Sequence, residues 1–131
     1  MRNFGSDKLS AIEAKFEAQK IAFGPIAFQA VRVMRDLGIL HLVEASRKDG
    51  ILAEEIAEKL QLSKYGVQVL LDAGISSQVV MQQNDKFRLT KTGHFILNDP
   101  LTEANMDFVQ DVNYLGFYNL EKSVMKGNLR A

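Results

Sequence analysis

The N-terminal part of the chain begins with the apolar spacing of an amphipathic helix. Over residues 8–23, apolar positions follow alternating three- and four-residue steps, and polar Gln19 fills the one gap. These apolar positions are Leu9, Ile12, Phe16 and Phe23. Pro25 lacks a backbone donor and disfavours helical geometry at Gly24, so it is predicted to end or kink this helix.

A second helix is predicted over about residues 26–36, and it is apolar on more than one side. One stripe contains Ile26, Ala30, Val33, Met34 and Leu37. Phe28 and Val31 lie off that stripe. Because a lone small domain rarely covers two sides of one helix, the pattern indicates a homodimer. The predicted dimer-interface residues are Ile12, Phe16, Phe23, Phe28 and Val31.

The middle of the chain has the pattern of a helix-turn-helix followed by a hairpin. A short helix, "ILHLVEASRK", precedes Asp49-Gly50, and Ile51-Leu52 could form a short strand. Helix 53–60 is joined by "QLS" to a second helix, with Ser63 as N-cap and Gly74 as a left-handed C-cap. "QVVMQQ-ND-KFRL" then predicts a two-stranded hairpin.

Two further helices are predicted after the hairpin. "KTGHFIL" is short, and its Phe95, Ile96 and Leu97, with Phe87 and Leu89 of the hairpin, would attach the wing to the body. Asp99-Pro100 has the N-cap and first-residue pattern of another helix start. Its helical spacing continues to Val124, with a break near Gly116.

The fold class predicted from these elements is mainly α. It is a winged helix-turn-helix with a small two-stranded β wing and additional N- and C-terminal helices for dimerisation. The segments are 1–37, the dimerisation helices; 38–98, the winged helix-turn-helix; and 99–131, a C-terminal helix and linker. Together they form one compact domain.

Composition narrows the classes of function. The 131 residues carry 16 cations and 16 anions, so no net field attracts a polyanion. The chain lacks cysteine and any G-x-G, which argues against disulfides, thiolate metal sites and the phosphate loops of nucleotide sites. The apolar stretch "IAFGPIAFQAV" is too short to span a bilayer. We therefore expect a cytoplasmic soluble protein with no membrane association.

Isolated titratable residues give no catalytic or metal site. His41 and His94 stand alone in the sequence, and His94 beside the wing could meet a phosphate but is more typical of a surface histidine. An acidic run at four-residue steps is typical of a solvated helix face. It comprises Asp99, Glu103, Asp107 and Asp111.

Two surfaces have candidate binding residues. In "NYLGFYNLEKSV" the aromatic residues cannot share one helical stripe, so they either pack in a core or dimer, or line a ligand pocket. The candidate pocket residues are Asn113, Tyr114, Phe117 and Tyr118. A DNA surface would need Lys64, Gln68, Lys86 and Arg88, but the second helix is neutral and the first is acidic, which argues against nucleic-acid binding.

The chain resembles the N-terminal dimerisation domain of S-adenosylmethionine-dependent O-methyltransferases that act on small molecules. The matching segments are "AFQAVRVMRDLGILHLVE", "ILAEEIAEKLQLSKYGVQVLLDAGI", "DKFRLTKTGHFILND" and "ANMDFVQDVNYLGFYNLEKSVMKG". The resemblance implies intertwined N-terminal helices, a winged helix that does not bind DNA, and a later helix forming one wall of the acceptor pocket.

In this family, cofactor binding and methyl transfer belong to a following Rossmann-like domain, whereas this sequence stops at Ala131. We therefore expect a non-catalytic dimerisation and substrate-wall domain, with no catalytic, metal or cofactor residues of its own and S-adenosylmethionine as cofactor of the parent enzyme. The alternative is a dimeric winged-helix transcription regulator of the MarR or ArsR type. A third possibility is a ligand- or partner-binding adaptor built on the aromatic helix.

Overall fold

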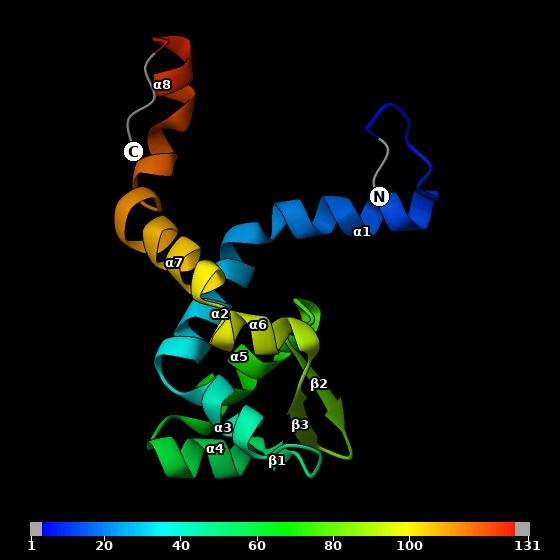
Figure 1. Cartoon of the computed structure of the whole chain (residues 1–131), viewed down its shortest axis with the longest axis vertical. Coiled ribbons are helices and arrows are strands. Elements are labelled where there is room, and N and C mark those ends of the chain that lie inside the picture. The colour runs from blue at the N-terminus through cyan, green and yellow to red at the C-terminus, as the bar shows by residue number, and fades with distance from the viewer. Residues whose placement is uncertain (1–3, 128–131) are drawn as a thin grey trace.

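In the computed structural model, which describes residues 4–127, a helical body carries two projecting arms (Figure 1). The body consists of helices α2 (Gly24–Asp36) to α6 (Lys91–Asn98) and a small sheet. Helix α1 (Ala11–Ala22) leaves it on one side, and the segment from α7 (Pro100–Phe108) to α8 (Leu120–Met125) leaves it in a different direction. The outermost ends of the predicted segments 1–37 and 99–131, including most of the polar tail "KGNLRA", lie outside the described residues.

The predicted fold class is confirmed: the structure is mainly helical, with a small antiparallel sheet. The strands are β1 (Ile51–Leu52), β2 (Val80–Gln83) and β3 (Lys86–Leu89). The helices are α1 (Ala11–Ala22), α2 (Gly24–Asp36), α3 (Ile39–Ala45), α4 (Ala53–Leu60), α5 (Lys64–Ser76), α6 (Lys91–Asn98), α7 (Pro100–Phe108) and α8 (Leu120–Met125). Between α7 and α8 lie a π-helical turn, η1 (Val109–Asn113), and a 3₁₀ turn, η2 (Gly116–Asn119).

The wing has three strands in the order β1-β3-β2, one more than the predicted two. Ile51 of β1 pairs with Phe87 of β3, and Val80 of β2 pairs with Leu89, both antiparallel. The short strand suggested by Ile51-Leu52 is therefore real. The hairpin turn has left-handed φ at both central residues, 53° at Asn84 and 66° at Asp85, as in a type I′ turn.

The helix pair α4–α5 forms where it is predicted, with one correction. The Ser63 Oγ accepts a hydrogen bond from the Gly66 amide at 3.1 Å and caps α5. Gly74 does not end this helix. It is buried inside α5, and the left-handed residue is Gln78, whose N–H donates to the carbonyl of Ile75. The Val79 amide donates to the carbonyl of Gly74, which completes a Schellman motif on a non-glycine residue.

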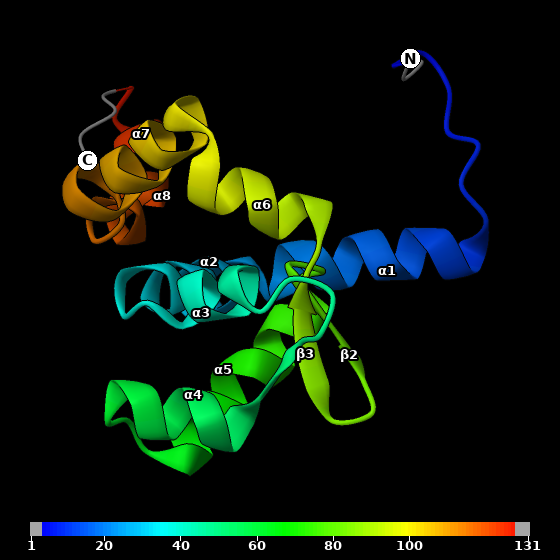
Figure 2. The ribbon, with the colours of Figure 1, turned by 60° about the horizontal axis from the view of Figure 1, so that its bottom comes forward.

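The "LTKTG" segment forms the junction between the hairpin and α6, and its Thr90 and Gly93 hold the two together. The Thr90 hydroxyl donates to the Gln78 carbonyl at 2.6 Å and accepts from the Gly93 amide at 3.0 Å. Gly93 is buried so closely against the hairpin that a Cβ there would lie 2.3 Å from the Val79 carbonyl oxygen. The start of α6 can therefore lie this close to the end of the hairpin only with glycine at this position (Figure 2).

The core lies between α2, α3, α4, α5 and the sheet. Phe87 is its largest fully buried side chain, at 1% exposure, and Leu89, Ile96 and Leu97 pack partly buried against it. The prediction that Phe95 also attaches the wing to the body is wrong. Its ring is exposed and meets only the edge of the neighbouring His94 ring, because the adjacent Ile96 and Leu97 take the inward positions of α6.

Replacing Gly93 with alanine is expected to destabilise the protein by about 1–3 kcal/mol, because the added methyl overlaps the backbone of Val79 and the side chain of Leu89. Urea unfolding measures the change. Gly66→Ala in the first turn of α5 is the matched control, since its Cβ meets nothing closer than 3.6 Å. It should stabilise by about 0.5–1 kcal/mol. Equal stability of the two variants would contradict the close approach of α6.

Candidate functional site

The N-terminal arm (residues 9–23) contains α1, a helix of mixed charged and apolar residues, none of which is buried. The Ser10 hydroxyl accepts from the Glu13 amide at 3.1 Å and starts α1, and the backbone turns at Phe23 into α2, where Pro25 occupies the first turn. Ile12, Phe16 and Phe23 are all exposed. Three of the five predicted interface residues therefore lie on this arm and are free to contact another surface.

The other two predicted interface residues lie against their own chain. Val31 is only 5% exposed and belongs to the core, so it offers no surface to a partner. Phe28 is half-buried and stacks on Tyr114, with the ring centroids 5.4 Å apart. One part of the apolar surface of α2 is thus covered within the chain, by the core and by Tyr114, whereas Ile26 and Leu37 remain exposed.

The C-terminal arm (residues 100–127) is attached to α2 by polar contacts along its first half. Arg35 Nη2 donates to Asp107 Oδ1 at 2.6 Å, and Gln29 Nε2 donates to Gln110 Oε1 at 2.6 Å. The Tyr114 hydroxyl donates to the Pro25 carbonyl at 3.0 Å. These contacts fix the direction in which the arm leaves the body. The π-helical turn η1 lies within this attached stretch.

Arg35 is the most enclosed charged side chain of this attachment, at 11% exposure. Burial alone would lower its pKa, but the hydrogen bonds to Asp107 and Asp36 outweigh burial and raise the pKa above its ordinary value. The acidic run is therefore not simply a solvated face. Asp107 is an ion-pair partner, and Asp99 accepts from the Thr102 hydroxyl and amide, which lowers its pKa and caps α7.

The structure separates the four candidate pocket residues. Asn113 and Tyr114 are half-buried, Tyr114 against α2, whereas Phe117 is exposed and Tyr118 is 92% exposed farther along the arm. Leu115 is 87% exposed, and several other apolar side chains of this arm are exposed as well. These are Leu101, Phe108, Val112, Leu120, Val124 and Met125. Helical spacing includes Val112, Leu115, Leu120 and Val124, but it could not show that these side chains would be exposed.

The residues named for a DNA surface are dispersed. Lys64 Nζ lies 3.2 Å from Glu54 Oε1, and Gln68 donates to Asp72, so both α5 residues are engaged with carboxylates. The pKa of Glu54 is lowered, first by a hydrogen bond with its own backbone and second by the hydrogen bond from Lys64. Lys86 and Arg88 instead lie on β3.

Metal-binding and membrane-spanning features are not found within residues 4–127. No cluster of three or more His, Asp or Glu residues in this range could hold a metal ion. His94 Nδ1 lies 3.5 Å from Glu44 Oε2 on the surface. No helix of this range is both long and apolar enough to cross a membrane.

A family model for the Dimerisation2-like domain matches residues 15–87, which is more than half of the chain. The chain belongs to this family. The match runs from the N-terminal arm to the hairpin, so the Dimerisation2-like domain includes the helix pair and most of the wing. The comparison with curated protein sequences gave no significant match.

Solved structures share the fold of this Dimerisation2-like domain at low sequence identity. The S-adenosylmethionine-dependent methyltransferase SibL is 22% identical, with a TM-score of 0.70, over 82% of this chain and 32% of its own. LepI, solved with S-adenosylmethionine, is 17% identical, with a TM-score of 0.72, over 91% of this chain and 30% of its own. Human N-acetylserotonin methyltransferase is 20% identical, with a TM-score of 0.66, over 96% and 37%. The chain thus spans about a third of the length of the structures it matches.

Replacing Asp107 with asparagine is expected to destabilise the attached part of the arm by about 1 kcal/mol, because it removes the charged acceptor of the enclosed Arg35. Hydrogen exchange of the α7 amides should become faster. Asp111→Asn, one turn along, is the matched control and should leave exchange unchanged, since within residues 4–127 Asp111 has no ion pair. Identical exchange in both variants would contradict the attachment.

Proposed function

We propose that this chain is the non-catalytic, N-terminal dimerisation region of an S-adenosylmethionine-dependent methyltransferase of the O-methyltransferase type, and that it forms a homodimer. Its segments are the dimerisation helices over 1–37, the winged helix-turn-helix over 38–98, and the connection toward a catalytic domain over 99–131. The membership in the Dimerisation2-like family and the methyltransferase folds that share its architecture support this assignment.

The observation that carries the proposal is that α1 is helical yet unsupported within its own chain. None of its 12 residues is buried. An isolated helix of about this length is marginal in water, and most helical stability in proteins comes from packing an apolar face. A partner surface against Ile12, Phe16 and Phe23 supplies that packing.

A second copy of the chain is the partner that best fits these arms. Both arms are apolar and project away from the body, so two copies can each cover the other's exposed side chains in a two-fold arrangement. The charges on α1 also favour a second copy as the partner. The exposed apolar residues of α1 are interspersed with both cations and anions, so this helix does not select a partner of one opposite charge. We assign Ile12, Phe16 and Phe23 to the interface, together with Ile21, which the sequence stripe does not contain.

The attached half of the C-terminal arm is proposed as a wall of the acceptor pocket in the parent enzyme. Asn113 and Tyr114 are the residues of this wall nearest the body, where the Tyr114 hydroxyl is held by the Pro25 carbonyl and its ring by Phe28. Phe117 and Tyr118 extend the wall outward, and their exposure leaves them available to a catalytic domain or a substrate.

Sedimentation of the purified chain is expected to show a dimer, and Phe16→Glu should shift it to monomer. A buried charge without a partner cannot be accommodated in an apolar interface. Tyr65→Glu is the matched control, because Tyr65 is an equally exposed aromatic on α5, away from both arms. It should leave the dimer intact. A clean monomer of the unmodified chain at high concentration would overturn the dimer proposal.

The chain alone is expected to bind no S-adenosylmethionine, because it has no glycine-rich phosphate or cofactor loop of the Rossmann type. Isothermal titration calorimetry with the cofactor tests this. Heats that fit a micromolar dissociation constant would show that the cofactor site lies in this region and would refute the non-catalytic assignment.

A further inference from the structure

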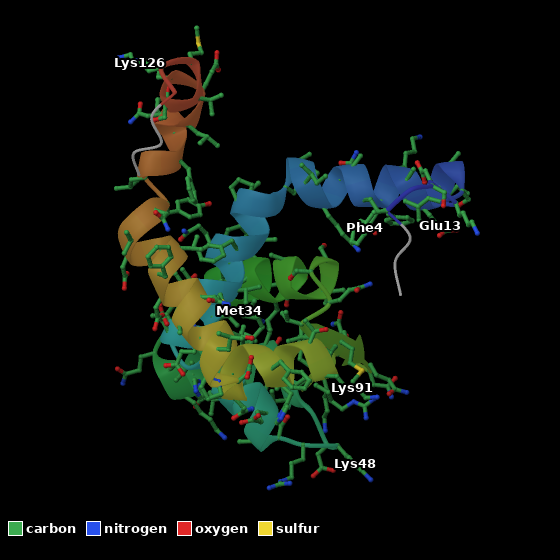
Figure 3. All side chains as sticks on the ribbon, turned by 45° about the horizontal axis from the view of Figure 1, so that its top comes forward. Phe4, Glu13, Met34, Lys48, Lys91 and Lys126 are labelled. Carbon is green, nitrogen blue, oxygen red and sulfur yellow. The ribbon has the colours of Figure 1, made fainter. Side chains whose placement is uncertain are left out.

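A surface groove lies on the body, where the α3–β1 loop, the hairpin and α6 meet. It has a volume of about 660 Å³. Its apolar surface comes from Met81 and Leu89, with the buried Val43 beneath them. Its rim carries four cations, Arg47, Lys48, Arg88 and Lys91. Figure 3 shows Lys48 and Lys91 on the same side of the molecule, although they lie far apart in the sequence.

The cations of this groove are poorly compensated. Two carboxylates, Glu44 and Asp49, also border it. Glu44 Oε2 accepts from the neutral Asn98 Nδ2 at 2.6 Å, and the four cations outnumber the two carboxylates. Among residues 4–127, Arg47, Lys48 and Lys91 form no ion pair within 4.0 Å, and Arg88 donates only to the neutral amide of Gln83. The neutral total charge of the chain therefore conceals a local positive surface.

The groove is elongated rather than enclosed. A second hollow of about 390 Å³ adjoins it and shares Lys48, Asp49 and Arg88 with it. This second hollow continues past Lys86 to the hairpin turn at Asn84. Sites for small molecules are usually enclosed and bury most of the ligand, whereas an extended peptide needs a long open groove.

Contacts of Thr90 and Gly93 hold the walls of the groove in place. Thr90 joins the end of β3 to the carbonyl of Gln78, and the tight approach of Gly93 fixes the start of α6. Lys91 is the first residue of α6, where the helix dipole adds to the positive potential. The site is thus preformed, which lowers the entropic cost of binding.

We propose that this groove docks an acidic segment of a partner protein, with an apolar side chain seated on its apolar surface. Carboxylates of the segment pair with Arg47, Lys48 and Arg88, while Met81 and Leu89 receive the apolar side chain. Nucleic acid fits less well, because its affinity depends on many phosphate contacts and the groove contains two carboxylates of its own. The proposal is independent of dimerisation and of methyl transfer.

The test uses fluorescence polarisation of the full chain with a short fluorescein-labelled peptide of alternating Glu and Leu. We expect Lys48→Glu to weaken binding about tenfold and Lys59→Glu to change it by less than about twofold. Lys59 is the matched control, because it is exposed on α4 away from the groove and its reversal alters the net charge equally. Arg47→Glu is the second groove variant, should Lys48→Glu lose its thermal unfolding transition.

Three further measurements complete the test. A peptide with Gln in place of Glu should bind at least about tenfold more weakly, and Met81→Ser should weaken the original peptide without altering its salt dependence. Equal binding of the Gln peptide, equal losses in Lys48→Glu and Lys59→Glu, or no binding at all would overturn the proposal. Tighter binding of duplex DNA, abolished by Lys48→Glu, would also overturn it and assign the groove to nucleic acid.

Discussion

The close packing of α2 on α5 is the contact on which the rest of the structure depends. The Met34 side chain is fully buried at its centre, and a Cβ on Gly74 of α5 would lie 3.1 Å from the terminal methyl carbon of Met34 (Figure 3). This contact places the core side of α2 against the helix pair. It thereby turns Gln29 and Arg35 toward the C-terminal arm, so one helix both completes the core and sets the direction of the arm.

The two arms show the limit of what one chain can bury. The core buries apolar side chains from Val31 of α2 to Met106 of α7. Outside it, α1 and the outer half of the C-terminal arm keep their apolar side chains exposed to solvent. Large exposed apolar surfaces are uncommon on monomers and mark contact surfaces. The polar attachment of the first half of the C-terminal arm holds such a surface at a fixed angle, which a specific assembly requires.

The local charge of each surface depends on which residues the fold brings together, and the total charge of the chain does not reveal it. The acidic helix α4 neutralises Lys64 of the helix that would read DNA, whereas cations from the α3–β1 loop, β3 and α6 gather around one groove. Arg47 and Lys48 are separated in sequence from Arg88 and Lys91 by about forty positions. Only the return of the hairpin beside the α3–β1 loop brings them together, so a count of charges along the chain could not find this surface.

The sequence by itself determined the local elements, because capping, turn chemistry and apolar spacing act over a few residues. The Ser63 and Asp99 caps, the Asn84-Asp85 turn and helix 53–60 could all be identified in this way. Tertiary structure alone decided which apolar faces remain free. Val31, on a predicted dimer face, is buried in its own core, Phe28 is half-buried against Tyr114, and Gly74 is a packing contact rather than a cap. Periodicity reveals that a face is apolar, but the partner that covers it depends on contacts between segments far apart in the chain.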